Sequence, residues 1–307
     1  MKKLTKKEIY AEHGIEYDQK TGKIFAPIMG GMWINPLLVN GNAKIGKGAY
    51  HFSMLAGNIE YELNIAFTQK TVTAKKSGKL VKVTVIDEDN PIIVKVMGTC
   101  PCVCRNKAGK IACYAMGGNY QYATTKAYLA IRTLVMRECM DFAERAIKAQ
   151  IKADKIRLCR IHASGDFFSV EYAEMWKRIV NEFQNVTFWT YTKNKAFEHA
   201  FDGMKNANIV KSFLPSGKMN FGHCDHIMRM YKLLKESGKK VHICFCGIEE
   251  YAGIPVKHCT DCHSCAENEY VLFVEHSTEY KAESDPLFPE LVKLILSQNA
   301  ENAAIAA

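Results

Sequence analysis

Apolar side chains in the first third of the chain lie in short runs rather than at helical spacing. Three of these runs are β-rich and are separated by Gly, Asp and Asn, which favour turns. They cover residues 51–54, 80–86 and 92–96. Ahead of them, residues 5–13 fit one short helix, and Tyr17–Phe25 fits a hairpin that turns at Lys20-Thr21-Gly22. The pattern therefore predicts a β-rich N-terminal region.

Beyond Cys113 the pattern changes to helices that alternate with short apolar strands. Apolar residues spaced by three and four predict one long amphipathic helix over 121–152. Further helices are predicted over 170–183, 195–205, 225–236 and 288–298. Strands are predicted over 157–162, 186–191, 209–214, 241–245 and 270–275. This alternation is typical of parallel βαβ units.

With the run at 92–96 included, about six parallel strands are predicted, which fits an α/β fold built as a partial (β/α) barrel. A doubly wound open sheet is the alternative. In either fold, the chemistry is expected in the loops that follow the strands. We expect a helix–hairpin appendage over residues 1–40, the barrel domain over 41–298 and a frayed tail over 299–307.

The clustering of the cysteines, together with the expected cell compartment, indicates metal binding. No N-terminal stretch resembles a secretory signal, and no window reaches the roughly 18 apolar residues of a membrane-spanning helix. We therefore expect a cytoplasmic protein with no membrane partner. In a reducing cytosol, clustered thiols are more often metal ligands than disulfides. Nine of the 12 cysteines are clustered, whereas Cys139, Cys159 and Cys224 stand alone and are expected to be small buried residues.

The C-terminal cysteines carry the strongest signal for metal. Cys246 is followed after twelve residues by Cys259, Cys262 and Cys265, which are separated by two-residue gaps. Such gaps let consecutive thiolates face one metal or cluster, and a distant fourth ligand completes the shell. Zinc and a [4Fe–4S] cluster both accept four thiolates. Two histidines in the same stretch are alternative ligands.

A second cysteine group follows the predicted strand at 92–96. Cys100, Cys102 and Cys104 alternate with other residues, and Cys113 follows after eight intervening residues. A cysteine loop after a strand is where an open, catalytic cluster is expected. We predict Cys100, Cys104 and Cys113 as its ligands, with Cys102 as an extra candidate. A structural zinc knuckle is the alternative.

A third signal, Ser164-Gly165-Asp166, follows the next predicted strand. Ser-Gly leaves backbone groups open to a ligand, and the carboxylate of Asp166 could hold an ammonium group. The same three residues could instead cap the helix that begins near Val170.

Several motifs, in this order, resemble the gene product 88 family of bacteriophages and mobile elements. They are Asn42–Lys47, Phe52-Ser53, Thr99–Pro101, Cys113–Ala115, Arg160–Phe167 and the trailing Cys-x-x-Cys-x-x-Cys. The resemblance covers residues 40–276 and implies a phage or mobile-element origin.

More distantly, the layout resembles radical S-adenosylmethionine (SAM) enzymes. In those enzymes, three cysteines after the first barrel strand hold a [4Fe–4S] cluster that binds SAM. The resemblance implies a SAM site at Ser164, Gly165 and Asp166, in place of a Gly-Gly-Glu motif, and an auxiliary cluster at Cys246–Cys265. The first cysteines are separated by three and then eight residues, rather than by three and then two. A fourth thiolate from Cys102 would leave no open iron.

Net charge adds one more possible partner. The chain carries 41 Lys and Arg against 32 Asp and Glu, and the formal charge of +9 is compatible with nucleic acid. Two functions therefore stay open. One is a radical-SAM-like enzyme that modifies an unidentified substrate. The other is a non-catalytic protein that binds nucleic acid or another partner, in which zinc or iron–sulfur centres stabilise the loops.

Overall fold

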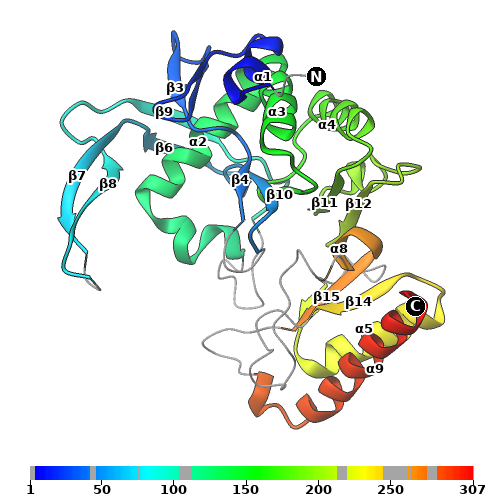
Figure 1. Ribbon diagram of the computed structural model, residues 1–307. Coiled ribbons are helices and arrows are strands. Elements are labelled where there is room, and N and C mark those ends of the chain that lie inside the picture. The colour runs from blue at the N-terminus through cyan, green and yellow to red at the C-terminus, as the bar shows by residue number, and fades with distance from the viewer. Residues whose placement is uncertain are drawn as a thin grey trace. The chain divides into compact units, whose positions relative to one another are not determined.

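The computed structural model describes residues 4–41, 46–74, 77–103, 113–212, 220–244, 262, 264–274 and 282–306, with the backbone alone at residues 114 and 299–306 (Figure 1). The chain divides into two compact units. The first unit comprises Met1–Val39, His51–Ile156 and Ile161–Glu182. The second comprises Asn40–Tyr50, Arg157–Arg160 and Phe183–Ala307. Each unit is therefore built from separated stretches of the chain.

The first unit opens with a helix and a small antiparallel sheet. The helix begins at a capping box, in which the side chain of Thr5 accepts from the amide of Glu8 and the carboxylate of Glu8 accepts from the amide of Thr5. The elements are α1 (Lys6–Glu12), β1 (Tyr17–Asp18), β2 (Lys23–Ala26) and β3 (Met32–Ile34). The sheet order is β1-β2-β3, and both pairings are antiparallel. The predicted helix and hairpin are confirmed.

Two helices replace the single helix predicted over 121–152. They are α2 (Ala123–Glu138) and α3 (Met140–Asp154). Between them, Cys139 has φ −139° and ψ 50°, which are not helical angles. The amide of Cys139 still donates to Val135, and its carbonyl still accepts from Ala143. Because the apolar spacing continues across this one residue, the sequence pattern does not reveal the break.

The predicted partial barrel of about six parallel strands is wrong. The run at 92–96 forms β9 (Ile93–Met97), which pairs antiparallel with β6 (Glu60–Asn64) in a two-stranded sheet. Its side chains alternate between exposed and buried, whereas a barrel strand is covered on both faces. A second antiparallel pair consists of β7 (Phe67–Thr73) and β8 (Leu80–Ile86). The described strands form a mixed α/β arrangement of five separate sheets, and none of these closes into a barrel.

Parallel pairing is nevertheless present. One sheet has the strand order β12-β11-β10-β5-β4, in which β10 pairs parallel with β11 and β11 pairs parallel with β12. The strands are β4 (Val39–Asn40), β5 (Ala49–Ser53), β10 (Leu158–Ser164), β11 (Thr187–Thr192) and β12 (Ala207–Lys211). The predicted βαβ connection between β10 and β11 is confirmed, and its helix is α4 (Val170–Glu182). The helix predicted over 195–205 is wrong, because only the 3-10 turn η3 (Lys195–Phe197) forms there.

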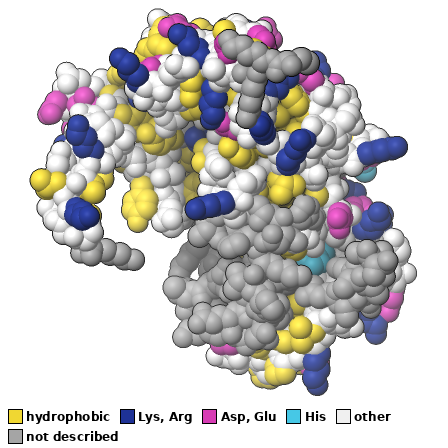
Figure 2. Space-filling model, in the orientation of Figure 1, with side chains coloured by type: hydrophobic (Ala, Val, Ile, Leu, Met, Phe, Trp, Pro, Cys, Tyr) yellow, Lys and Arg dark blue, Asp and Glu magenta, His cyan; other side chains and the backbone are white. Residues whose placement is uncertain are grey.

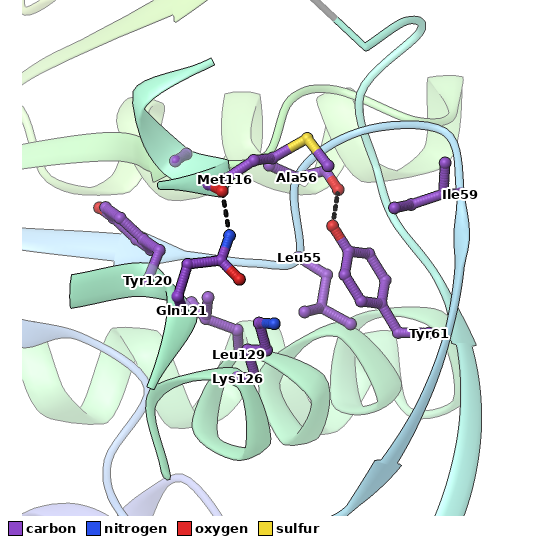
Figure 3. A pocket seen from close by; sticks show the side chains of 10 residues that line it. Leu55, Ala56, Ile59, Tyr61, Met116, Tyr120, Gln121, Lys126 and Leu129 are labelled. Carbon is purple, nitrogen blue, oxygen red and sulfur yellow. Dashed lines mark hydrogen bonds between the residues drawn. The ribbon is translucent and has the colours of Figure 1, made fainter. Parts of the chain in front are cut away.

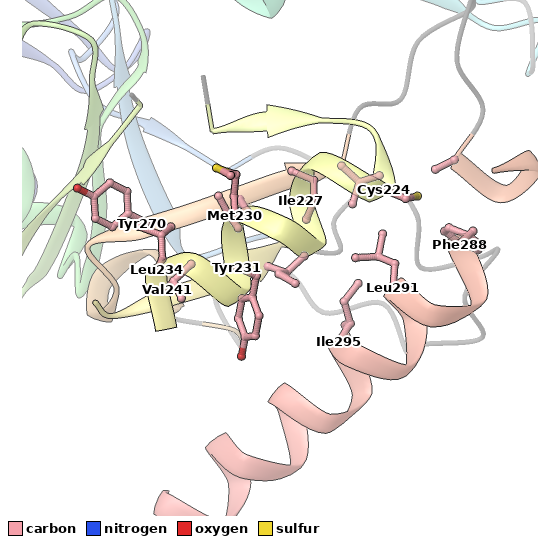
Figure 4. Packing of buried hydrophobic residues seen from close by; sticks show 14 residues of the cluster. Cys224, Ile227, Met230, Tyr231, Leu234, Val241, Tyr270, Phe288, Leu291 and Ile295 are labelled. Carbon is pink, nitrogen blue, oxygen red and sulfur yellow. The ribbon is translucent and has the colours of Figure 1, made fainter. Parts of the chain in front are cut away.

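The second unit has its own apolar core, formed by a small parallel sheet and two helices (Figure 4). The sheet order is β13-β15-β14. The elements are β13 (Phe221–Gly222), α5 (Cys224–Glu236), β14 (Val241–Cys244), β15 (Tyr270–Val274) and α9 (Phe288–Ala306). Ile227 of α5 and the α9 residues Leu291 and Ile295 are fully buried in this core. Each such side chain stabilises the fold by about 1.5–3 kcal/mol relative to exposure.

The remaining elements are short helical turns. They are η1 (Tyr114–Met116), η2 (Gly118–Gln121), α8 (Ser264–Glu267) and η4 (Ala282–Ser284). Within the described part of the chain, no helix is long and apolar enough to cross a membrane.

Candidate metal centres

Backbone hydrogen bonds hold Cys100 in place at the end of β9. The amide of Thr99 donates to the carbonyl of Leu55 at 2.9 Å, and the Thr99 hydroxyl donates to the same carbonyl at 3.0 Å. The amide of Cys100 donates to the carbonyl of Gly57 at 3.2 Å. Gly98 permits this close approach, because an added Cβ would lie 2.3 Å from the Gly57 carbonyl oxygen. The segment that carries Cys100 is thus fixed before the cysteine loop begins.

Cys100 and Cys113 belong to one small apolar cluster of the first unit. Cys100 is 9% exposed and packs with Ala56 and Ala115. Cys113 is half-buried and packs against the same cluster. Two cysteines with twelve residues between them in the sequence thus pack in the same cluster, and their role as ligands stays a prediction.

A cavity of about 150 Å³ lies beside this cluster (Figure 3). Leu55, Ala56, Met116 and Tyr61 are among the residues that line it. The Tyr61 hydroxyl donates to the carbonyl of Ala56 at 2.8 Å. Burial, and then the neighbouring thiols of the two cysteines, raise the pKa of Tyr61. Ligand pockets usually enclose about 300–1,000 Å³, so this cavity suits a small group rather than a cofactor as large as SAM.

The loop Ser164-Gly165-Asp166 lies next to the cysteine segment. The amide of Asp166 donates to the hydroxyl of Thr99 at 3.2 Å. Gly165 has φ +87°, and a Cβ there would lie 2.6 Å from the same hydroxyl oxygen. The hydroxyl of Ser164 donates to the carbonyl of Met54 at 2.7 Å. The loop therefore lies against Thr99, which directly precedes Cys100, and against Met54, which directly follows β5.

The carboxylate of Asp166 forms a hydrogen bond within its own loop. It is 1% exposed, and its carboxylate accepts a hydrogen bond from the amide of Phe167 at 2.8 Å. At the start of α4, the hydroxyl of Ser169 accepts from the amide of Tyr172 at 3.2 Å. The capping contact of α4 is therefore made by Ser169, and the Ser-Gly-Asp segment precedes it.

In the second unit, Tyr191 donates a hydrogen bond to a cysteine. Its hydroxyl lies 2.7 Å from the sulfur of Cys265, which is half-buried on α8. The guanidinium of Arg160 lies 4.9 Å from the centre of the Tyr191 ring, within cation–π range. Burial and then the thiol of Cys265 raise the pKa of Tyr191, so the phenol stays protonated and able to donate at neutral pH.

Cys244, at the end of β14, lies near the same tyrosine. In the strand register it is opposite Phe273 of β15, whose ring centre is 5.8 Å from that of Tyr191. The Cys244 thiol is also among the groups that raise the pKa of Tyr191. Cys244 was not among the predicted ligands, and the structure brings it towards the neighbourhood of Cys265.

Polar contacts also fix the short helix that carries Cys265. The side-chain amide of Asn208 donates to the carbonyls of Cys265 and Asn268, both at 2.8 Å. These carbonyls at the end of α8 lack helical partners, so Asn208 satisfies them. The thiol of Cys262 lies 3.2 Å from the hydroxyl of Ser264. Asn208 of β12 thereby holds the end of α8 in place.

Three predicted ligands, Cys104, Cys246 and Cys259, lie outside the described residues. Among the residues that the structure does describe, no three His, Cys, Asp or Glu side chains gather closely enough to hold a metal. The donors that are described are the buried thiol of Cys100 and half-buried thiols on loops, on a strand end and on α8; they have the soft chemistry that zinc and iron–sulfur clusters require.

The isolated cysteines differ from the clustered ones. Cys159 and Cys224 are fully buried, as predicted, and burial raises the pKa of Cys159 far above that of a free thiol. Cys139 is only half-buried, and its sulfur lies 3.5 Å from the carbonyl of Pro27. The two fully buried thiols are packing residues.

The sequence analysis missed the two tyrosines. Tyr61 lies on β6 and Tyr191 on β11, where an aromatic residue in an apolar run is typical of core packing. No local motif distinguishes them, since their significance depends on cysteines that are distant in the sequence.

Comparison with known proteins identifies the family. The model of the family described as gene product 88 matches residues 38–275. The gene 88 protein of Mycobacterium phage D29 is 43% identical to this chain over 81 residues. Those residues are 26% of this chain, and the match spans 32% of the length of the phage protein. No solved structure matches this chain. Because the family model spans most of the sequence, the protein belongs to the gene product 88 family.

Proposed function

We propose that this protein binds metal through two separate groups of cysteine thiolates, each holding an iron–sulfur centre. The observation that carries the proposal is the packing of two predicted ligands in one cluster of the first unit. Cys100 and Cys113 pack in one cluster, although a cysteine loop separates them in the sequence. Isolated cysteines have no reason to converge in pairs, whereas ligands of one centre must.

The second unit supports the same function by a different contact. Hydrogen bonds to ligand sulfurs are a recurring way in which proteins tune iron–sulfur centres. The hydroxyl of Tyr191 already donates to the sulfur of Cys265. A partner of this kind, outside the ligand shell, orients a ligand and fixes its electronic environment.

Metal analysis of anaerobically purified protein tests the proposal. Two [4Fe–4S] centres would give about eight irons and about eight acid-labile sulfides per chain. Stoichiometric zinc without sulfide would replace the iron–sulfur assignment by structural zinc. Protein that is folded and contains neither metal would refute metal binding altogether.

SAM binding at the first centre is the second candidate function. The hydrogen bond from Asp166 to Thr99 favours it, because it brings the loop within one residue of Cys100. The buried, hydrogen-bonded carboxylate and the small cavity weigh against it. If Asp166 holds the ammonium group of SAM, Asp166→Asn should weaken binding roughly ten- to a hundredfold in calorimetry. Absence of SAM binding by metal-replete protein would remove this candidate and leave metal binding intact.

A further inference from the structure

The antiparallel ribbon of β7 and β8 carries a net positive charge. Residues 67–86 contain five lysines and no Asp or Glu, against a net charge of +9 for the whole chain. Lys70, Lys79 and Lys82 are in the described part of this segment, and all three are exposed. An acidic run, Asp87-Glu88-Asp89, follows directly after β8 at the base of the ribbon. The lysines therefore lie along the ribbon, and the acidic residues lie at its base.

The ribbon is a defined structural element rather than a loose loop. Its two strands pair over seven residues each, from Phe67 opposite Ile86 to Thr73 opposite Leu80. At its base, the ring of Phe67 stacks on Tyr128 of α2 at a centre distance of 4.4 Å. Seven residues of strand span about 23 Å, and in the described chain neither strand pairs with a third one. Figure 1 shows the two strands extending away from α2.

Exposed apolar side chains accompany the lysines. Leu80 is 74% exposed, and Val72 and Val81 are 39% and 38% exposed. In Figure 2, the same part of the surface shows apolar and basic side chains next to one another. Lysines on a free edge also protect sheets against aggregation, but that role alone does not require exposed apolar residues beside them. Lysines and exposed apolar side chains that lie together on one element are typical of a surface that binds another molecule.

We propose that this ribbon binds double-stranded DNA. A two-stranded antiparallel ribbon fits the major groove, which is about 12 Å wide. Lys70 lies on β7 and Lys82 on β8, which form the two edges of the ribbon, so their ammonium groups can reach phosphates on both sides of a groove. The acidic run would keep the base of the ribbon away from the phosphates. This function is independent of the cysteine centres.

Fluorescence anisotropy of the full chain with a labelled mixed-sequence duplex of about 20 base pairs tests the proposal over about 50–200 mM salt. Wild type should bind, with affinity that falls steeply as salt rises. Each lost phosphate contact lowers the salt slope by about 0.9 on duplex DNA, so K70Q/K79Q/K82Q should lower it by about 2.7. The single variant Lys79→Gln should lower it by about 0.9, which keeps the test informative if the triple variant misfolds.

A matched control replaces three exposed lysines elsewhere, as K20Q/K205Q/K240Q, and should leave affinity and slope near wild type. The proposal is overturned if wild type does not bind the duplex at about 50 mM salt, or if the ribbon variants bind like wild type. An equal loss in the control would also overturn it, because binding would then follow net charge alone. Tighter binding to the single strand of the same sequence would replace the duplex by a single-stranded ligand.

Discussion

In the first unit, the thiols of Cys100 and Cys113 lie among methyl groups, and the nearby hydroxyl of Tyr61 donates to a backbone carbonyl. In the second unit, the corresponding hydroxyl of Tyr191 donates directly to the sulfur of Cys265. A hydroxyl that donates to a ligand sulfur orients that thiolate and withdraws part of its electron density. If both proposed centres form, they should therefore respond differently to the same chemical change.

Removal of one thiol from each centre should have the largest effect. Cys113→Ala and Cys265→Ala should each retain about half of the bound metal, because each removes a ligand from one of two centres. Cys265→Ala should also lower the free energy of unfolding by about a further 1 kcal/mol, since the half-buried Tyr191 hydroxyl loses its acceptor. Metal analysis and urea unfolding measure the two effects. Cys139→Ala is the control and should keep all of the metal; a fully metallated Cys265→Ala protein would contradict the assignment.

The backbone support of the first centre is tested at Gly165. Gly165→Ala should lower the free energy of unfolding by about 2–4 kcal/mol, because its φ of +87° is strained for alanine and the new Cβ would lie 2.6 Å from the Thr99 hydroxyl oxygen. Gly30→Ala, in the same unit, has a similar φ of +81° with no atom within 4 Å of the new Cβ, and should cost only about 1 kcal/mol. Urea unfolding followed by circular dichroism gives both values. Equal costs would mean that the close contact with Thr99 does not matter.

The paired variants Tyr191→Phe and Tyr61→Phe compare the two tyrosines directly. Removal of a hydrogen bond to sulfur destabilises the more negative, reduced state of an iron–sulfur centre. At about 1 kcal/mol for one hydrogen bond, Tyr191→Phe should lower the reduction potential of the second centre by about 40 mV. Tyr61→Phe, which loses only a bond to a carbonyl, should leave the potential of the first centre unchanged. Redox titration with metal analysis checks this, and equal shifts in both variants would contradict the difference.

The smallest effect concerns the ionic contacts between α3 and α4 in the first unit. Burial alone would raise the pKa of Glu144, but hydrogen bonds from Arg178 and Lys148 outweigh it and lower the pKa. A lowered carboxyl pKa stabilises the fold above the unfolded value of 4.5, and this contribution is lost as the pH falls further. Because Arg178 is half-exposed, Glu144→Gln should cost less than about 1 kcal/mol at pH 7. Urea unfolding at pH 7 and pH 3 should show the cost at pH 7 only; a cost of equal size at pH 3 would contradict an ionic origin.

The sequence predicted elements well where one face of a helix is buried over several turns. Residues 170–183 and 225–236 became α4 and α5, whose apolar residues repeat at three and four positions. The prediction that residues 92–96 belong to a parallel barrel was wrong. A strand pattern shows that a segment is extended, but it does not show which strand the segment pairs with. Pairing with β6, about 30 residues earlier, removed that run from any parallel sheet.

The sequence by itself identified the two cysteine groups, the Ser164-Gly165-Asp166 loop and the family, because residue types and their spacing are enough to recognise each of them. Only the tertiary structure decided which side chains meet the thiols. Tyr191 and Cys265 are 74 residues apart, and Ser164 and Met54 are 110 apart. Local propensity acts over a few residues, whereas contacts at such separations depend on how whole strands pair and pack. The division into two units, each with its own group of cysteines, was decided in the same way.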